Sequence, residues 1–334
     1  MRNFLTSFFE KLADKIREKE PPVTIIEEYK EVVLEEIIEV EPIPPQPKKP
    51  SKTPKKKTEI APYVRNQARD LMEIMEVPFL ALSKNRKSPI LYESSDGTRK
   101  VKVTRHTGHF LASIYDWDII LFVASKMQRI LNDMSDIPPR SMVVPRHELL
   151  KAIHRRNGKK TDADLEKTLS RLQLTGIETT IRNEDYKYKA GFGFLDSWRY
   201  TERKDIKEIE ITLSQWLYDG ICAKGSLLKV DPAYFELTSG LKRFLYRTAR
   251  KHAGKNKDGW RFTVEGLYEK SGSEQEFKKF KSDLKISVKG NNIPEYEIEW
   301  IEENGKTFVS FKRSTLHDLN RLADKIDKEE EKML

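Results

Sequence analysis

Two stretches of the sequence decide the fold: WRFTVEGLYEKSGSEQEFKKFKSDLK, residues 260–285, and YEIEWIEENGKTFVSFKR, residues 296–313. The first predicts a pair of strand residues, a short helix, a glycine-containing turn and a second helix capped by Ser273. The residues of that second helix that recur at helical spacing are Phe277, Phe280 and Leu284. The second stretch predicts a β-hairpin, because Asn304-Gly305 is a strong signal for a two-residue turn.

A further helix precedes these elements. It is predicted over residues 239–252, within PAYFELTSGLKRFLYRTARKHAG, and Gly254 ends it. Residues 211–230 add a short helix and the edge of a strand. Helix, helix, turn, helix and β-hairpin is the order of a winged helix, a variant of the helix-turn-helix.

The first half of the chain predicts the same order of elements. Residues 116–134 form an apolar-faced helix, and residues 143–160 predict a strand edge, a helix begun at a proline and a basic turn. A third helix starts at Thr161, with Asp164 placed as in a capping box, and Gly176 ends it. Its expected buried stripe consists of Leu165, Leu169 and Leu172.

A second hairpin is predicted after this helix. In IETTIRNEDYKYKAGFGFLDSWRY, residues 177–200, apolar and polar side chains alternate before the polar turn 183–185, and an aromatic-rich strand returns. At the beginning of this half, residues 64–78 predict a helix, and residues 80–106 predict short strands around a Ser-Asp-Gly turn.

These patterns predict an α+β fold with two tandem winged-helix domains, residues 61–205 and residues 206–315. A charged helix is expected over residues 316–334. Residues 1–60 are expected to be a largely disordered extension, because nine of the chain's 16 prolines fall in this segment or at its end and favour an extended linker.

The start of the extension is amphipathic. Its apolar stripe consists of Phe4, Leu5, Phe8, Leu12 and Ile16. Such a helix docks on a partner protein or lies on a membrane surface. Few basic residues flank the stripe and acids balance several of them, which favours a protein partner bound through Phe4, Phe8, Leu12 and Ile16.

Bulk composition excludes several classes of protein. No apolar run approaches the length that spans a membrane, and Cys222 is the only cysteine, which excludes an internal disulfide framework and fits a reducing cytoplasm. The net charge of +9 is concentrated: residues 240–290 hold 14 basic and 6 acidic side chains, and residues 138–174 hold 9 and 4. Two such concentrations favour two surfaces that face a polyanion.

The second concentration predicts specific contacts to duplex DNA. No acid lies between Glu236 and Asp258, so the cations of the intervening helix are expected to share one exposed face and to gain from phosphate. The cations expected on the face opposite its apolar side chains are Arg243, Arg247, Arg250 and Lys251. The helix after Ser271 and Ser273 is the candidate recognition helix, and the side chains expected to face away from its core are Gln275, Lys278, Lys279, Ser282 and Lys285.

In the first half, equivalent cations occupy the turn and the third helix. They are Arg155, Arg156, Lys159, Lys160, Lys167 and Arg171. For any single one of these residues, an ordinary surface cation is an equally good interpretation.

An enzymatic function finds little support. His106 and His109, with Tyr115 nearby, loosely resemble the paired histidines and nucleophile of nicking enzymes, but the spacing of three does not place both side chains on one strand face. No phosphate-binding Gly-Lys-Ser/Thr loop is present. We therefore expect no catalytic residues, no metal and no cofactor.

The segments LSQWLYDGI, FLYRTARKHAG and LYEKSGS, within residues 211–296, resemble the plasmid replication initiator A family, in the neighbourhood of the TrfA-like initiators. The resemblance implies a cytoplasmic bacterial protein that binds direct repeats, or iterons, at a plasmid origin. It also implies opening of adjacent AT-rich DNA with the host initiator, recruitment of the replicative helicase, and self-dimers that repress or couple origins. The implied DNA contacts are Arg243, Arg247, Arg250, Lys251, His252, Ser271, Ser273, Lys278, Lys279 and Lys281.

Three alternatives stay open. A plasmid transcriptional repressor would use the same two domains. A nicking relaxase would need a metal-dependent tyrosine. A structural or interaction protein would carry its basic faces for solubility alone.

Overall fold

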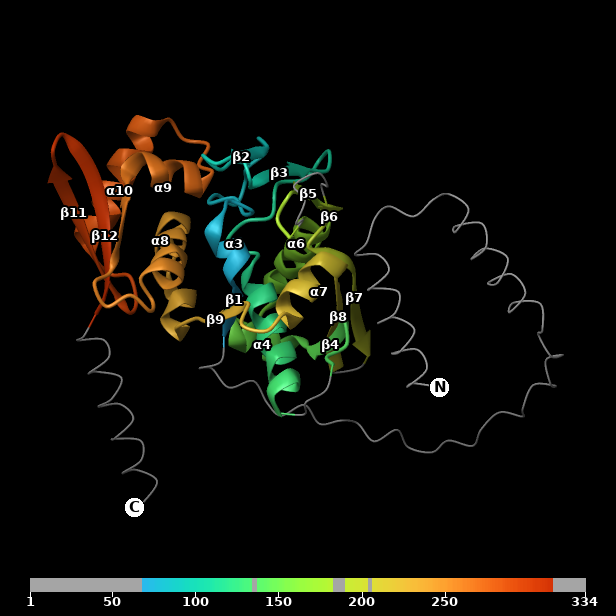
Figure 1. Cartoon of the computed structure of the whole chain (residues 1–334). Helices are drawn as coiled ribbons and strands as arrows, with labels where there is room; N and C mark the ends of the chain where they lie inside the picture. Colours follow the sequence, from blue (N-terminus) through green and yellow to red (C-terminus); the bar gives the residue numbers. More distant parts are fainter. Residues whose placement is uncertain (1–67, 134–136, 183–189, 204–205, 315–334) are drawn as a thin grey trace, which may run out of the picture. The chain divides into compact units, whose positions relative to one another are not determined.

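The computed structural model describes residues 68–133, 137–182, 190–203 and 206–314 (Figure 1). All of them belong to the unit Ala61–Leu334. The predicted partner-binding stripe of Phe4, Phe8, Leu12 and Ile16, the linker and the predicted C-terminal helix over residues 316–334 lie outside the described residues.

The first half opens with β1 (Arg69–Leu71) and α3 (Met72–Glu76). The predicted helix over residues 64–78 is therefore only partly right. Arg69–Leu71 pairs antiparallel with the distant strand β9 (Leu227–Lys229), and this tertiary pairing overrides the local helical pattern. The predicted strands around the Ser-Asp-Gly turn are confirmed as β2 (Ile90–Glu93) and β3 (Lys100–Arg105), which pair antiparallel.

Three helices follow in the first half: α4 (Asp118–Asp133), α5 (Arg146–Ala152) and α6 (Lys159–Leu174), with β4 (Ser141–Pro145) between the first two. The predicted stripe of α6 is confirmed, since Leu165, Leu169 and Leu172 are fully buried. The predicted capping box is wrong. The helix begins earlier, with Gly158 as the N-cap and no side-chain cap, and it ends at Leu174, before Gly176.

The predicted hairpin over residues 177–200 is divided between two sheets. β5 (Thr175–Thr179) and β6 (Ala190–Phe192) pair and complete the four-stranded sheet β2-β3-β5-β6. β7 (Leu195–Arg203) pairs instead with β8 (Ile206–Leu213), in the three-stranded sheet β4-β8-β7. The pairing of β7 with β8 crosses the expected domain boundary at residue 205.

The second half follows its predicted order closely. α7 (Gln215–Cys222) and the 3₁₀ helix η2 (Pro232–Glu236) precede α8 (Gly240–His252). β10 (Trp260–Thr263) and α9 (Val264–Ser271) come next. Figure 1 shows α8 beside α9 and α10 (Phe277–Gly290).

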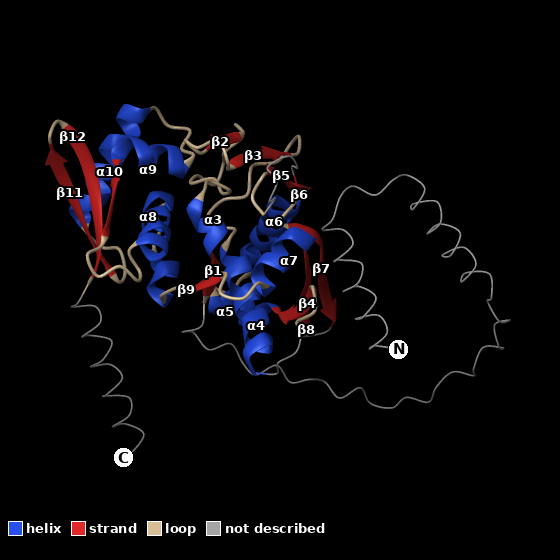
Figure 2. Cartoon of the chain, in the orientation of Figure 1, coloured by secondary structure: helices blue, strands red, loops and turns tan. Residues whose placement is uncertain are grey.

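The predicted Asn-Gly hairpin is confirmed. β11 (Tyr296–Glu303) and β12 (Lys306–Arg313) pair antiparallel around Asn304 and Gly305, whose φ angles of 51° and 73° are those of a type I′ turn. Figure 2 shows the two strands as one long hairpin next to α10.

The two three-stranded sheets share one arrangement. In each, the last strand lies between the other two, as β4-β8-β7 and as β10-β12-β11. In each, two helices lie between the first and second strands of the chain order, α5 and α6 in the first half and α9 and α10 in the second. The expected repetition of element order is therefore visible in the strand order of the two sheets.

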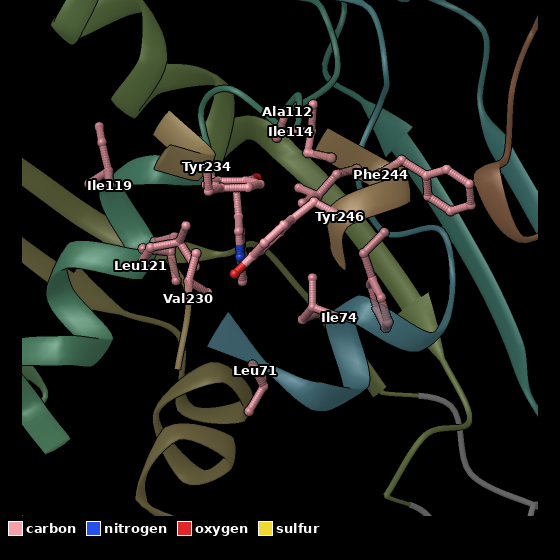
Figure 3. Packing of buried hydrophobic residues seen from close by; sticks show 14 of the residues in the cluster. Leu71, Ile74, Ala112, Ile114, Ile119, Leu121, Val230, Tyr234, Phe244 and Tyr246 are labelled. Atoms are coloured by element: carbon pink, nitrogen blue, oxygen red, sulfur yellow. The ribbon is translucent and has the colours of Figure 1, made fainter. Parts of the chain in front are cut away.

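The core joins the two halves. Figure 3 shows Leu71 and Ile74 from the first half near Tyr246 and Phe244 of α8. The Tyr246 hydroxyl donates to Glu295 Oε2 at 2.8 Å and accepts from the Asp231 amide at 2.7 Å, so the buried ring keeps its polar end satisfied. Full burial of one large apolar side chain stabilises a fold by about 1.5–3 kcal/mol, which makes this shared core a strong constraint on both halves.

Candidate nucleic-acid interface

A basic hollow of about 570 Å³ lies against α6, and we call it the α6 hollow. Six of its lining side chains are Lys or Arg and three are Asp, so its formal charge is positive. The predicted cations that line it are Arg155, Arg156, Lys167 and Arg171 from the first half and Arg243 from the second. Lys160 is exposed on the first turn of α6, and Lys159 begins the helix.

Two of the cations from the first half are held by the protein itself. Arg171 Nη2 lies 2.6 Å from Oδ1 of Asp116, a carboxylate that is 1% exposed, and its Nε donates to Asp116 Oδ2 at 2.9 Å. Arg155 donates to the Tyr115 carbonyl oxygen at 3.0 Å. Arg156 and Lys167 are exposed. The exposed pair is therefore better placed for phosphate than the anchored pair.

The structure corrects the predicted cationic face of α8. Arg243 and Arg247 are only 4% and 5% exposed. Arg243 Nη1 pairs with Asp118 Oδ1 at 2.7 Å, and Arg247 Nε pairs with Asp70 Oδ2 at 2.6 Å. The expectation that these arginines share an exposed face is wrong. α8 contains no acidic residue, and acids from distant segments of the chain pair with its arginines instead.

Lys251 and His252 at the end of α8 and Lys270 of α9 gather around Glu76. His252 Nε2 lies 3.1 Å from Glu76 Oε2, Lys251 Nζ lies 3.8 Å from the same oxygen, and Lys270 Nζ lies 2.8 Å from Oε1. Burial raises the pKa of Glu76, but the neighbouring His252 imidazole and Lys270 ammonium outweigh burial and lower the pKa from 4.5 to about 2. Arg250 donates to the Lys229 carbonyl oxygen at 2.6 Å. Lys251 and His252 therefore fasten the end of α8 to the first half, and Arg250 fastens it to β9 of the second half.

The turn before α10 uses its hydroxyl groups internally. Ser271 is 2% exposed and donates to the Tyr268 carbonyl oxygen at 2.7 Å, while Ser273 Oγ accepts from the Gln275 amide at 3.2 Å. Ser273 is not the N-cap, which is Glu276. Gly272, with φ of 56°, is needed here because an added Cβ would lie 2.7 Å from Pro78 Cβ.

The predicted lysines of α10 lie outside the core. Lys278, Lys279 and Lys285 are exposed and Lys281 is half-buried. Three of them contact other side chains of the protein. Lys279 Nζ lies 2.6 Å from Asp283 Oδ1, Lys281 Nζ lies 3.4 Å from Thr307 Oγ1, and Lys285 Nζ lies 3.7 Å from Glu302 Oε1. Lys278 has no ion-pair partner among the described residues. The inward prediction is confirmed for Phe280 and Leu284, which are buried, whereas Phe277 is half-buried.

Sequence reasoning missed the acids that bind these cations and the cations of one loop. Asp70, Glu76, Asp116 and Asp118 pair with residues up to 194 positions away, and such pairs leave no local pattern. The loop cations, Lys84, Arg86 and Lys87, stand in LSKNRKS, where a run of cations could have been noticed.

The side chains that could bind a metal or act as a nucleophile form no metal cluster in the described parts of the chain. Within residues 68–133, 137–182, 190–203 and 206–314, no group of three or more His, Cys, Asp or Glu side chains could hold a metal ion. The rings of His106 and His109 lie 6.1 Å apart, and the Tyr115 hydroxyl donates to the Thr238 carbonyl oxygen at 2.8 Å. No described helix is both long and apolar enough to cross a membrane.

Comparisons with known proteins agree on one family. Residues 69–298 match the sequence model of "Replication initiator protein A". The "Putative replication protein" of Wigglesworthia glossinidia brevipalpis is 33% identical over 231 residues, which cover 68% of this chain and 82% of that protein.

Among solved structures, a selenomethionine derivative of domains 2 and 3 of RctB matches with a TM-score of 0.52 and 12% identity, over 72% of this chain and 96% of that one. At this identity the likeness shows a shared fold alone. The family match and the sequence relative carry the assignment: the chain belongs to the replication initiator protein A family.

Proposed function

We propose that this chain initiates plasmid replication by binding repeated duplex sites at an origin through two winged-helix units, without chemistry of its own. The first unit would include β4, α5, α6, β7 and β8, and the second α8, β10, α9, α10, β11 and β12. Family membership supports the initiator role. The shared strand order of the two sheets supports the paired units.

The observation that carries the proposal is the exposure of the α10 lysines. α10 is the third helix of its unit, the position from which a helix-turn-helix protein enters the major groove. Lys278 and Lys279 are exposed there, and Gln275 and Ser282 share the exposed surface. Lysines supply sequence-independent affinity by releasing counterions, and the amide and hydroxyl groups can read base edges.

The hairpin of the second unit is a poor surface for phosphate. Four of its side chains, Glu297, Glu299, Glu302 and Glu303, are exposed carboxylates on β11. These carboxylates outnumber the exposed cations of β12, which are Lys306, Lys312 and Arg313, and the net negative charge opposes approach to the DNA backbone. We therefore assign the binding of this unit to α10.

The test reverses charge on α10 in the full chain, as Lys278→Glu combined with Lys279→Glu. The probes are duplex fragments of the noncoding DNA that flanks the chain's gene, and a duplex of mixed sequence. We expect the affinity for the best flanking fragment to fall at least about 100-fold, because two phosphate contacts become repulsions. The thermal midpoint is expected to stay within about 2 °C, since both side chains are exposed.

Lys224→Glu is the matched control, because Lys224 is exposed on the turn between α7 and β9 and lines neither the α6 hollow nor the groove beside α10. Unchanged binding by the α10 variant would remove that helix from the interface. Failure of the wild-type chain to prefer any flanking fragment over mixed sequence would contradict the initiator proposal itself.

Partner binding is proposed for the N-terminal segment. We assign contact with the host initiator or the replicative helicase to the stripe of Phe4, Phe8, Leu12 and Ile16. We assign self-association to the folded body. The protein is proposed to act in a bacterial cytoplasm. Deleting residues 1–60 should leave duplex affinity within about threefold, since the proposed DNA contacts lie elsewhere. Origin opening in a reconstituted assay should be lost. A drop of orders of magnitude in affinity would instead place the basic run of the linker, Lys55–Lys57, in the DNA interface.

A further inference from the structure

The loop Leu82–Ser88, which we call the bridging loop, contributes to two hollows at once. Lys84 and Asn85 line the α6 hollow. Leu82, Ser83 and Arg86 line a second hollow of about 480 Å³, whose other wall includes Gln275, just before α10, and Asp283 and Ile286 within it. The bridging loop therefore borders both the basic hollow beside α6, the third helix of the first unit, and the hollow beside α10, the third helix of the second.

The bridging loop is fastened to the turn that precedes α10. Arg86 is 6% exposed, and its guanidinium donates to the carbonyl oxygens of Ser88 and Pro89 at 3.0 and 2.9 Å and to that of Gly272. The hydroxyls of Ser83 and Ser88 donate to the two carboxylate oxygens of Glu274 at 3.0 and 2.9 Å.

The bridging loop also touches the start of α8. A Cβ on Gly240 would lie 2.0 Å from the Leu82 carbonyl oxygen, so only glycine permits this approach. A loop held at both its ends and at its centre has little conformational entropy left to lose when a ligand binds, which favours affinity.

Two lysines of the bridging loop expose their ammonium groups to solvent. Lys84 and Lys87 are exposed, and neither has an ion-pair partner in the described part of the chain. Lys84 Nζ lies 4.7 Å from the centre of the Tyr115 ring, and Lys87 Nζ lies 5.6 Å from that of Phe110. The aromatic faces orient both ammonium groups without neutralising them.

The carboxylates beside Lys84 are mostly neutralised. Asp116 and Asp118 line the α6 hollow, but both are buried and paired, with Arg171 at 2.6 Å and with Arg243 at 2.7 Å. Asp164 is exposed on the same hollow, where Arg156 and Lys167 are exposed as well. The charge that faces solvent on the α6 side of the bridging loop is therefore positive, whereas the hollow on its α10 side is lined by Glu274 and Asp283 together with the buried Arg86.

We infer that the bridging loop is a third DNA contact, in which Lys84 and Lys87 bind backbone phosphates between the segments that α6 and α10 approach. The inference rests on the proposed function. A lysine binds phosphate as a point charge and carries no base readout in this setting. The loop should therefore raise affinity for every duplex and leave the preference among sequences unchanged.

The test removes the two charges as Lys84→Gln with Lys87→Gln, in the full chain, beside Lys278→Gln with Lys279→Gln and the control Lys224→Gln. Dissociation constants are measured on the best flanking fragment and on mixed-sequence duplex across a series of salt concentrations. We expect the loop variant to lose about tenfold or more on both probes. The slope of log affinity against log salt should fall by about 1.8, because each lost phosphate contact contributes about 0.9.

The α10 variant separates this inference from the function on which it rests. It should weaken binding to both probes, because its lysines are assigned to phosphate. Gln275→Ala with Ser282→Ala, which removes the groups assigned to base edges, should lose more affinity on the flanking fragment than on mixed sequence, whereas the loop variant should lose the same on both. Full affinity and an unchanged salt slope in the loop variant, with a weakened α10 variant, would overturn the bridging-loop contact and leave the proposed function standing. Unweakened binding by both variants would overturn both.

Discussion

α8 and α10 are both rich in cations, and the two helices use them in different ways. The central cations of α8 are arginines, and Arg243 and Arg247 are buried in ion pairs. The cations of α10 are lysines, and Lys278 and Lys279 are exposed. A guanidinium is weakly hydrated and forms several hydrogen bonds in a fixed geometry, whereas an ammonium group is strongly hydrated and favours the surface. Residue type therefore separates the two helices where charge alone does not.

The carboxylates that pair with the cations of α8 and of α10 also differ in where they lie in the chain. The buried partners of α8 come from the first half, where Asp70 also accepts from the Trp117 indole N–H at 2.8 Å. The one carboxylate paired with an α10 lysine inside that helix is Asp283, four residues after Lys279. A helix whose cations are matched by distant acids joins parts of the fold. A helix that leaves its cations exposed is free to meet an external polyanion.

The largest effect is expected from breaking a pair of α8. Arg247→Ala leaves the buried Asp70 carboxylate without its cation, and removing one partner of a buried ion pair costs about 3–5 kcal/mol. Urea denaturation should show this loss in the free energy of unfolding. The matched variant Lys278→Ala should change it by less than about 0.5 kcal/mol. A loss below about 1 kcal/mol for Arg247→Ala would contradict the claim that the buried cations of α8 stabilise the fold while the exposed cations of α10 do not.

α6 is intermediate between the two helices, which sharpens the comparison within one element. Arg171→Gln should cost about 2–3 kcal/mol, less than Arg247→Ala, because Arg171 is partly exposed and water replaces part of the lost interaction with Asp116. Lys167→Gln should leave stability unchanged and weaken duplex binding about three- to tenfold. Equal stability losses in the two variants would show that exposure does not separate structural from binding cations here.

Local patterns of the second half were sufficient to predict most of its elements. The Asn304-Gly305 turn, the glycine after α9 and the helical spacing of Phe280 and Leu284 each depend on neighbours within a few residues. The first half was harder to predict because its strands pair over long distances. β1 meets β9, and β8 joins β4 and β7 across the expected boundary.

The candidate site was predicted only in part, for a related physical reason. A basic residue on a helix face has the same local signature whether or not an acid from another segment covers it. Lys278 and Lys279 were placed correctly on the surface, while the partners of Arg243 and Arg247 lie 125 and 177 residues away. The proposed role of the bridging loop follows from its position beside the two hollows that it lines, which the local sequence does not show.

Acid should weaken the attachment of α8 to the first half. The pKa of Glu76 is 4.5 in the unfolded chain and about 2 in the fold, so its contribution is present above about pH 4.5 and is lost as pH falls toward 2. Allowing for partial exposure, this contribution is about 2 kcal/mol. Glu76→Gln should therefore be less stable than the wild type at neutral pH. The difference should shrink between about pH 4.5 and about pH 2, measured by urea denaturation. A difference that does not change with pH would exclude this carboxylate as the source.

The smallest effect tests the one local pair of α10. The hydrogen bond from Lys279 lowers the pKa of Asp283, so this carboxylate is ionised at neutral pH and competes with phosphate for the lysine. Asp283→Asn should tighten duplex binding about two- to fivefold, because removing one exposed negative charge near a phosphate is worth up to about 1 kcal/mol in water. It should cost the helix only about 0.3–0.5 kcal/mol, the usual contribution of such an exposed pair. Weaker binding by this variant would mean that Asp283 orients Lys279 for its contact, and the exposed cations of α10 would then depend on a carboxylate just as those of α8 do.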